Sequence, residues 1–279
     1  MKLSQIFFAG ALSLAAIVTP AAAKEWKTVT IAMEGGYAPW NLTNADGTLG
    51  GFEPELAKHL CELAKVECKL IALDWDGMIT ALNAGKYDVM MDAVSITDER
   101  KQVIDFTVPY AATPAIFAAV KDGGFDKLPG TGTVIKLDSS KADPAALEPL
   151  RKALAGKTIG VQTATTFANF LYDNFKDVAT IQEYKTSAER DLDLAAGRID
   201  VGFDDETYFN AAFESADNAT LTLSGPSIGG KVWGEGMGLG IRKTDPELKA
   251  LLDEAIKAAI ADGTVKTLAL KWFKADVSP

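Results

Sequence analysis

The sequence has few of the residues on which metal sites and nucleophilic catalysis depend. Its 279 residues include one histidine, His59, and two cysteines, Cys61 and Cys68. A zinc site needs about four such ligands, and no motif around His59 supports Ser-His-Asp or Cys-His catalysis. We therefore expect no metal site and no cofactor, and we interpret His59 as a solvated helix residue.

Basic residues and long apolar runs are also scarce. Lys and Arg number 28 against 38 Asp and Glu, a formal charge of −10, which makes nucleic acid or an anionic membrane surface a poor partner. Past the N-terminal stretch, no segment approaches the roughly 20 uninterrupted apolar residues of a membrane-spanning helix. The acidity could favour cationic ligands, but on most secreted proteins it serves only solubility.

Residues 1–23 have the pattern of a secretory signal peptide. Lys2 supplies the positive charge, residues 6–18 the apolar core and Ala21–Ala23 a small-residue cleavage site. The mature chain is expected to begin near Lys24 and to work outside the cytoplasm. In an oxidising compartment, Cys61 and Cys68 are more readily a disulfide than metal ligands.

The mature chain alternates between apolar strand patterns and amphipathic helix patterns, which predicts an α/β fold. The predicted strands are 29–33, 68–72, 89–91, 158–162, 181–184 and 201–203, and the predicted helices are 53–65, 76–83, 167–175, 187–196, 246–261 and 264–273. Residues 84–89 and 196–201 share one order: helix, glycine, basic residue, Asp and buried strand. This similarity favours two similarly built lobes, although the same order of helix, glycine and strand also recurs by chance in α/β proteins. The Gly-, Asp- and Pro-rich tract 121–149 is interpreted as a surface excursion of the second lobe.

The stretch from Asp88 to Arg100 combines the features of a small-ligand site. A short apolar strand ends in small and polar residues, and Thr97 can cap a helix that carries Arg100. Backbone N–H groups left unpaired at a strand end bind anions, and a guanidinium fits a carboxylate bidentately. By itself, this window is also explained by a surface Arg at an ordinary helix start.

Motifs along the whole mature chain carry a family resemblance. They are Glu34–Trp40, Gly51–Glu53, Asp74–Gly77, Tyr87–Val89, Ser95–Arg100, Asp105–Tyr110, Gly160–Gln162, Gly238–Lys243, Asp262–Thr264 and Lys271–Phe273. The chain resembles periplasmic solute-binding proteins of ABC importers, in the polar amino-acid and opine branch. Leu128–Ser140 and Trp272–Pro279 are most similar to octopine- and nopaline-binding proteins. The Cys61/Cys68 spacing resembles a bridge in binders of lysine, arginine and ornithine.

The resemblance implies the type II periplasmic binding protein fold. This fold has two α/β lobes, two hinge crossovers and a ligand cleft between the lobes, which closes by hinge motion. We expect lobe 1 at residues 24–111 and 229–279, and lobe 2 at residues 112–228.

The resemblance also implies roles for individual residues. Arg100 would hold a ligand carboxylate, helped by N–H groups near Ser95 and by Thr166, and Asp205 would accept from the α-ammonium group. Tyr37 and Trp75 would sandwich the aliphatic part of the ligand. The remaining predicted site residues are Glu34 at the distal end, and Asp92, Ala93 and Thr163.

Two of these positions bear on the identity of the ligand. Asp92 departs from the small or hydroxyl residue usual in the family, and it could receive a second ammonium or a guanidinium group. Asp205 is typical of binders of free amino acids, whereas the overall similarity points to opines. The sequence leaves both ligand types open.

Three functions follow from this reading. The favoured one is a monomeric, non-enzymatic binding protein that delivers a cationic amino acid or an opine to an inner-membrane ABC permease. The first alternative is a cyclohexadienyl dehydratase-like enzyme, with Glu34 or Asp92 as general acid or base. The second is the ligand-sensing domain of a receptor.

Overall fold

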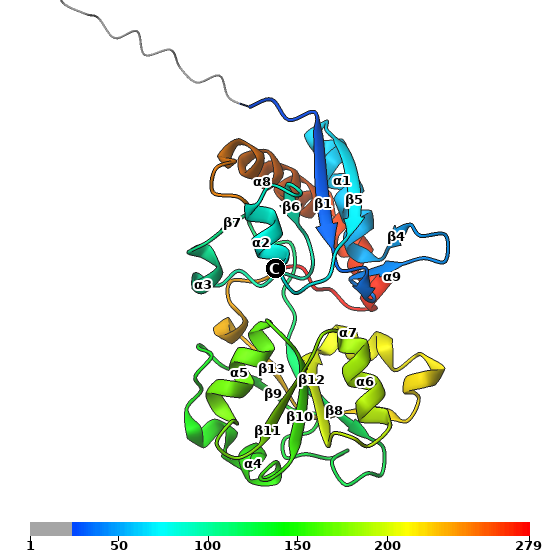
Figure 1. Cartoon of the computed structure of the whole chain (residues 1–279), viewed down its shortest axis with the longest axis vertical. Coiled ribbons are helices and arrows are strands. Elements are labelled where there is room, and N and C mark those ends of the chain that lie inside the picture. The colour runs from blue at the N-terminus through cyan, green and yellow to red at the C-terminus, as the bar shows by residue number, and fades with distance from the viewer. Residues whose placement is uncertain (1–23) are drawn as a thin grey trace, which may run out of the picture.

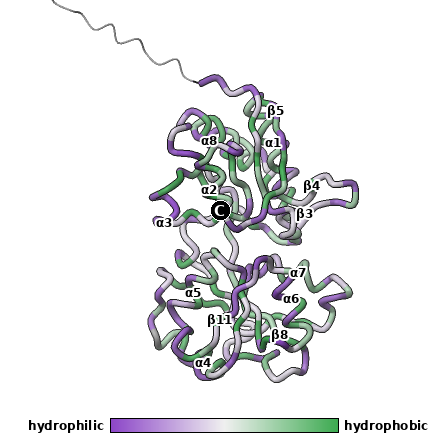
Figure 2. Tube along the Cα trace, viewed as in Figure 1, coloured by the Kyte–Doolittle hydropathy of each residue, from purple (hydrophilic) through white to green (hydrophobic). Residues whose placement is uncertain are grey.

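The computed structural model describes residues 24–279, so the predicted signal peptide at residues 1–23 lies outside the described residues. Two sheets form two lobes, one above the other in Figure 1. Figure 2 shows hydrophobic residues along the central elements of both lobes and hydrophilic residues in the surface loops. Within residues 24–279, no helix has the length and apolar character needed to cross a membrane.

The first lobe is built on a five-stranded sheet in the order β5-β1-β6-β14-β7. β1 runs parallel to β5 and β6, and β14 runs antiparallel to β6 and β7. The strands are β1 (Thr28–Met33), β5 (Glu67–Ala72), β6 (Val89–Met90), β7 (Asp105–Phe106) and β14 (Gly240–Ile241). The first lobe also contains a small three-stranded sheet of β2 (Gly36–Tyr37), β3 (Asn41–Thr43) and β4 (Leu49–Gly50).

Helices contributed by both ends of the chain complete the first lobe. They are α1 (Phe52–Ala64), α2 (Met78–Asn83), α3 (Asp98–Lys101), α8 (Pro246–Ala261) and α9 (Thr264–Phe273). α1, α8 and α9 pack on one another, and their apolar faces, with Leu56 and Ile256 fully buried, form a core with β1. The apolar residues whose helical spacing predicted α1, α8 and α9 thus lie on the faces that these helices bury.

The predicted disulfide is confirmed. Cys61 of α1 and Cys68 of β5 are bonded across a sequence separation of 7 residues, with their Cα atoms 6.1 Å apart. The bridge ties the end of α1 to the edge strand that follows it, away from the interlobe cleft.

We expect replacement of both Cys61 and Cys68 by Ala to lower the free energy of unfolding by about 2 kcal/mol, because the loop that the bond closes is short. Urea denaturation of the variant and the unreduced wild type measures this difference. Ligand affinity should stay unchanged; a loss of affinity as large as the loss of stability would contradict a purely structural bridge.

The second lobe is built on a six-stranded sheet in the order β11-β10-β12-β8-β13-β9. Its strands are β8 (Ala115–Val120), β9 (Val134–Lys136), β10 (Thr158–Gln162), β11 (Thr180–Tyr184), β12 (Val201–Asp205) and β13 (Leu221–Gly229). Its helices are α4 (Pro144–Ala153), α5 (Thr166–Asn174), α6 (Ser187–Ala195), α7 (Glu206–Ala212) and the 3-10 turns η1 (Ala216–Asn218) and η2 (Lys231–Trp233).

The tract 121–149 is more than the surface excursion that we predicted. β9 within it pairs with β13 at the edge of the sheet, and α4 begins at Pro144. Leu128, Leu137 and Leu147 are buried in the core of the second lobe. The tract therefore covers one side of that core. The sequence did not indicate this role, because the glycines and prolines of the tract are typical of surface loops.

The chain crosses between the lobes twice, first before β8 and again between η2 and β14. Val232 and Trp233 pack in the core of the second lobe, whereas Met237 forms bridges with Ser95 and Ala111. The tail returns to the first crossover, where the Val277 carbonyl accepts the Ala112 N–H at 2.9 Å. The C terminus accordingly lies near the crossovers in Figure 1.

Candidate functional site

The carboxyl ends of parallel strands from both sheets define the edges of the cleft. In the first lobe, Glu34 follows β1 and Asp92 follows β6. In the second lobe, Gln162 ends β10 and Asp205 ends β12. Open α/β sheets bind ligands outside these strand ends, and a pocket lies between them. It is lined by Glu34, Tyr37, Trp75, Asp92, Ala93, Ser95, Arg100, Gln162, Thr165, Thr166, Phe167, Asp204 and Met237.

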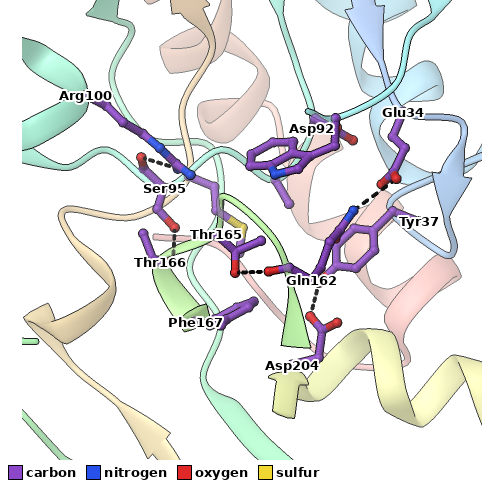
Figure 3. A pocket seen from close by; sticks show the side chains of 13 residues that line it. Glu34, Tyr37, Asp92, Ser95, Arg100, Gln162, Thr165, Thr166, Phe167 and Asp204 are labelled. Carbon is purple, nitrogen blue, oxygen red and sulfur yellow. Dashed lines mark hydrogen bonds between the residues drawn. The ribbon is translucent and has the colours of Figure 1, made fainter. Parts of the chain in front are cut away.

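Eight of the ten predicted site residues line this pocket, and Thr163 and Asp205 do not. Figure 3 shows Arg100 and Ser95 at one end, Glu34 at the other, and Gln162 with Tyr37 between them. The pocket therefore has a cationic end and an acidic end. That these side chains contact a ligand stays a prediction.

Arg100 is held at its end of the pocket without a carboxylate partner. Its guanidinium donates to the carbonyl of Ser95 at 3.1 Å and to that of Ala164 at 3.4 Å, and it lies 5.4 Å from the Trp75 ring. Among residues 24–279, no acidic group forms an ion pair with it, and burial lowers the pKa of Arg100 to about 10. A desolvated cation with donors to spare is a receptor for an anion.

Two local caps build this cationic end. The Thr97 side chain accepts from the Arg100 N–H and starts α3, while the Thr165 side chain accepts from the Ala168 N–H and starts α5. The first turn of α5 leaves further N–H groups without helical partners, and Thr166 lies there with its hydroxyl 3.4 Å from that of Ser95. A carboxylate beside Arg100 would also meet the positive end of α5.

The opposite end of the pocket carries buried carboxyl groups. Burial raises the pKa of Glu34 to about 7, with Asp204 and Asp74 adding to the effect against the hydrogen bond from Gln162. Burial, together with the charges of Glu53 and Glu34, raises the pKa of Asp92 well above its usual range. These groups resist ionisation because they are buried and lie near other carboxylates, and Lys185 offsets only part of this effect at Glu34.

The two predicted aromatic residues occupy different positions. Trp75 lines the pocket and donates its indole N–H to the carbonyl of Thr163 in the other lobe at 3.0 Å. Tyr37 stacks on Tyr208 with ring centroids 4.8 Å apart and donates its hydroxyl to Asp204 at 2.5 Å. Tyr37 is thus a contact between the lobes as well as a wall of the pocket.

Asp205 ends β12 but does not line the pocket, and its predicted role toward a ligand ammonium stays a prediction. Its carboxylate caps α7 by accepting from Thr207 and Tyr208 N–H groups and also accepts the hydroxyl of Thr113, so it lies outside the pocket. The neighbouring Asp204 faces the pocket instead. Adjacent residues of a strand point to opposite faces, so a displacement of one residue exchanges the two roles.

Asp204 is fully engaged by its own surroundings. One oxygen accepts from Tyr37 and from the Asp205 N–H, and the other accepts from Ser187 and from the buried Arg190. A carboxylate has about four acceptor positions. An ammonium group that approached Asp204 would therefore have to replace one of these donors.

Thr163 also lies outside the pocket, since its hydroxyl donates to Glu183 and its carbonyl accepts from Trp75. Five lining residues were absent from our predicted set: Gln162, Thr165, Phe167, Asp204 and Met237. Gln162 ends a family motif and donates to Glu34 across the cleft at 3.0 Å. Its place at the end of a predicted strand was the signal that could have identified it.

A two-lobed α/β fold with a polar pocket between the lobes defines a solute-binding protein. Residues 29–275 match the bacterial extracellular solute-binding proteins, family 3, and the chain belongs to that family. It is 43% identical to the octopine-binding periplasmic protein of Rhizobium meliloti, over 94% of this chain and 96% of that protein. It is 34% identical to the L-arginine-binding protein of Pseudomonas aeruginosa, over 96% of each chain.

A solved structure shows the same architecture. A periplasmic His/Glu/Gln/Arg/opine family-binding protein from Silicibacter pomeroyi, in complex with lysine, is 31% identical with a TM-score of 0.72, covering 90% of this chain and 99% of that one. The predicted fold and family are thereby confirmed. The family and its named relatives bind solutes, which also confirms binding over the dehydratase alternative.

Proposed function

We propose that this protein captures a cationic amino acid, or an opine derived from one, in the interlobe cleft and presents it to an inner-membrane ABC permease. The observation that carries the proposal is the polarity of the pocket. Among residues 24–279, Arg100 at one end forms no ion pair with an acidic group, and Glu34 and Asp92 at the other end form none with a basic group. A ligand with a carboxylate at one end and a cation at the other satisfies both ends. The octopine- and arginine-binding relatives support this class.

In this proposal each predicted residue meets a defined part of the ligand. Arg100, Ser95 and Thr166 bind the carboxylate. Trp75 and Tyr37 cover the aliphatic stem, with Ala93 leaving room beside it, while Glu34 and Asp92 meet the distal cation. Thr163 acts indirectly by accepting from Trp75, and Asp204 replaces Asp205 as the carboxylate nearest the ligand's amine.

The proposed setting follows from the relatives and from the N-terminal sequence. Two of the relatives named above, the octopine-binding protein and the Silicibacter pomeroyi protein, are periplasmic by name, and residues 1–23 have a signal-peptide pattern. We propose export through this peptide, cleavage near Lys24 and function as a monomer in the periplasm, without nucleic acid.

Calorimetric titration of the mature protein against lysine, ornithine, arginine, citrulline and octopine tests the proposal. We expect stoichiometric binding of at least one cationic ligand without turnover. Failure of all of the cationic ligands to bind, with glutamate or another anionic ligand binding instead, would overturn the proposed ligand class.

Closure of the cleft gives a prediction about shape. Direct contacts join the lobes, including the Lys185–Asp74 ion pair at 2.7 Å and the Trp75–Thr163 hydrogen bond. The pocket encloses only about 30 Å³, room for a few water molecules. An amino acid is larger, so ligand must enter an arrangement in which the lobes stand further apart. We expect the ligand-free protein to adopt that open arrangement in solution, and ligand to draw the lobes together.

We expect saturating arginine or octopine to lower the radius of gyration measured by X-ray scattering, while the far-ultraviolet circular dichroism stays constant. At a ligand concentration 100 times Kd, the folded state should gain about 2.7 kcal/mol, because the ligand binds only that state. A radius that does not change with ligand would argue against hinge closure.

A further inference from the structure

Asp92 carries an unpaired acceptor that faces the pocket. The residue is 4% exposed and lies two residues past the end of β6. Its Oδ1 atom accepts from the Asn41 amide at 2.6 Å, but within residues 24–279 its buried Oδ2 atom has no hydrogen-bond partner. Buried acceptors are nearly always paired, and the unpaired one here belongs to a residue that lines the ligand pocket.

The orientation of Asp92 is fixed from behind the pocket. Asn41 accepts the Gly35 N–H through its oxygen at 2.7 Å, and its amide nitrogen donates to both Asp92 and Glu53. Glu53 in turn accepts from Tyr110 and from the Ala93 N–H. Because Asn41 holds one oxygen of Asp92, the other oxygen stays directed away from this network.

The charge around Asp92 is entirely acidic. Among the described residues, no Lys or Arg forms an ion pair with Asp92, Glu34 or Glu53. The nearest charged or titratable groups are Glu34 after β1, Glu53 on α1, Tyr87 and Tyr110. Asp204 from the other lobe and Arg100 also line the pocket, but the Asp204 charge is taken up by Arg190.

These carboxyl groups are not arranged for a metal ion. Within residues 24–279, no group of three or more His, Cys, Asp or Glu side chains has a geometry that could hold one. Asp92 presents a hydrogen-bond acceptor to a narrow pocket that is partly lined by aromatic rings. The ligand group that suits such an acceptor is an organic cation with several N–H donors, such as a guanidinium or an ammonium group.

We propose that Asp92 is the residue that selects ligands with a charged distal group, through an ion pair between its free Oδ2 atom and a guanidinium or ammonium of the ligand. This inference rests on the proposed function, because it assumes that the ligand carboxylate lies at Arg100. A neutral ureido group of the same shape would form only neutral hydrogen bonds with the protonated Asp92 carboxyl, without an ion pair. It would therefore bind less tightly.

Proton release accompanies this ion pair. Burial and the neighbouring acids favour the protonated form of Asp92 while no cation is bound, and a bound cation favours the ionised form. Binding of a cationic ligand therefore releases a proton, and its affinity rises as the pH rises. A neutral ligand releases no proton from Asp92.

The test compares the Asp92→Asn variant with wild type. Asn keeps the acceptor for Asn41 and the side-chain volume but removes the charge. Calorimetry with L-arginine and L-citrulline gives the ratio of their dissociation constants, and titration of L-arginine and octopine in buffers of different ionisation enthalpy counts the protons released. As a control, Asp76→Asn removes an exposed carboxylate one residue from Trp75.

We expect Asp92→Asn to reduce the preference for arginine over citrulline by about tenfold or more, the usual effect of losing a charged hydrogen bond. Proton release should fall in this variant with arginine and with octopine, and Asp76→Asn should match wild type. An unchanged ratio and unchanged proton release, with Asp92→Asn merely less stable, would overturn the role of Asp92. Absence of wild-type binding to every cationic ligand of the panel, lysine and ornithine included, would instead overturn the proposed function.

Discussion

Replacing Arg100 with Ala should remove most of the affinity for ligand and leave the fold intact. The proposed ion pair joins a half-buried guanidinium to a ligand carboxylate. Loss of one member of such a pair leaves the other charge buried and unpaired, at a cost of about 2–5 kcal/mol. This corresponds to an increase in Kd of roughly thirtyfold to a few thousandfold.

The stability of the ligand-free protein should move little in this variant, because Arg100 has no acidic partner to lose within residues 24–279. Calorimetry gives the affinity, and thermal unfolding without ligand gives the stability. Arg100→Lys should recover only part of the affinity, since an ammonium group cannot reproduce the bidentate geometry.

Lys101→Ala is the matched control, because it removes a neighbouring cation of α3 that pairs with Glu235 on the surface. Surface pairs contribute little, so this variant should bind like wild type. Affinity close to that of wild type in Arg100→Ala would contradict the assignment of the carboxylate end.

The sequence predicted several elements whose boundaries are marked by side-chain chemistry. Pro246 starts α8, Thr97 caps α3, and the predicted bounds of β10, α8 and α9 match the structure. Helix α2 begins two residues later than predicted because Gly77 adopts a left-handed conformation with φ 88°. Caps, prolines and glycines act locally, so they can be recognised without the fold.

β8 and β13 were not predicted, since their place depends on partners far away in the sequence. β8 lies between β12 and β13 with both neighbours antiparallel. Its apolar run, Ala115–Val120, cannot be distinguished from a buried helix segment by periodicity alone. Only pairing with strands about 80 to 110 residues further along the chain fixes it as a strand.

The sequence indicated that the pocket lies at the end of β12, but not which of two adjacent side chains there faces the pocket. Both Asp204 and Asp205 follow an apolar run, and the family resemblance favoured Asp205. The extension of β12 through Asp205, which then caps α7, decides which carboxylate faces the cleft. A slip of one residue reverses the facing of every strand side chain, and the sequence contained nothing local to settle it.

Arg190 was invisible as a buried charge, because on α6 it follows the helical pattern of an ordinary surface arginine. In the structure it is 0% exposed and forms ion pairs with Asp191 at 2.8 Å and with Asp204. Burial alone would lower the pKa of Arg190, but these two carboxylates outweigh it and hold the pKa above its ordinary value. The guanidinium therefore remains charged inside the second lobe.

Two glycines make room for this arginine. Gly160 of β10 and Gly202 of β12 are paired neighbours, and a Cβ at Gly160 would come within 2.9 Å of the Arg190 Cγ atom. At Gly202 a Cβ would lie 3.3 Å from the Arg190 Nε atom. The side chain thus lies flat against the sheet and reaches Asp204 beneath the pocket.

Arg190→Met should be among the most destabilising substitutions in the chain. Met retains the apolar stem but leaves Asp191 and Asp204 buried without their cation, and breaking a buried pair in this way costs about 3–5 kcal/mol. Urea denaturation measures the loss. Arg198→Met provides the comparison, since Arg198 pairs with Asp193 on the surface with 61% of its side chain exposed, and it should cost less than about 1 kcal/mol.

Neutralising the stranded carboxylates should restore part of the stability lost in Arg190→Met. In the triple variant with Asp191→Asn and Asp204→Asn, no uncompensated charge remains buried, so the free energy of unfolding should rise above that of Arg190→Met alone. If the triple variant is no more stable than Arg190→Met, the stranded charges do not account for the loss. The lost packing of the guanidinium against Tyr208 and Phe209, at 5.4 Å and 4.7 Å, then does. We also expect Arg190→Met to lose stability as the pH rises from 5 to 8. Raising the pH ionises buried carboxyl groups beside residue 190, and in this variant no cation compensates their charge.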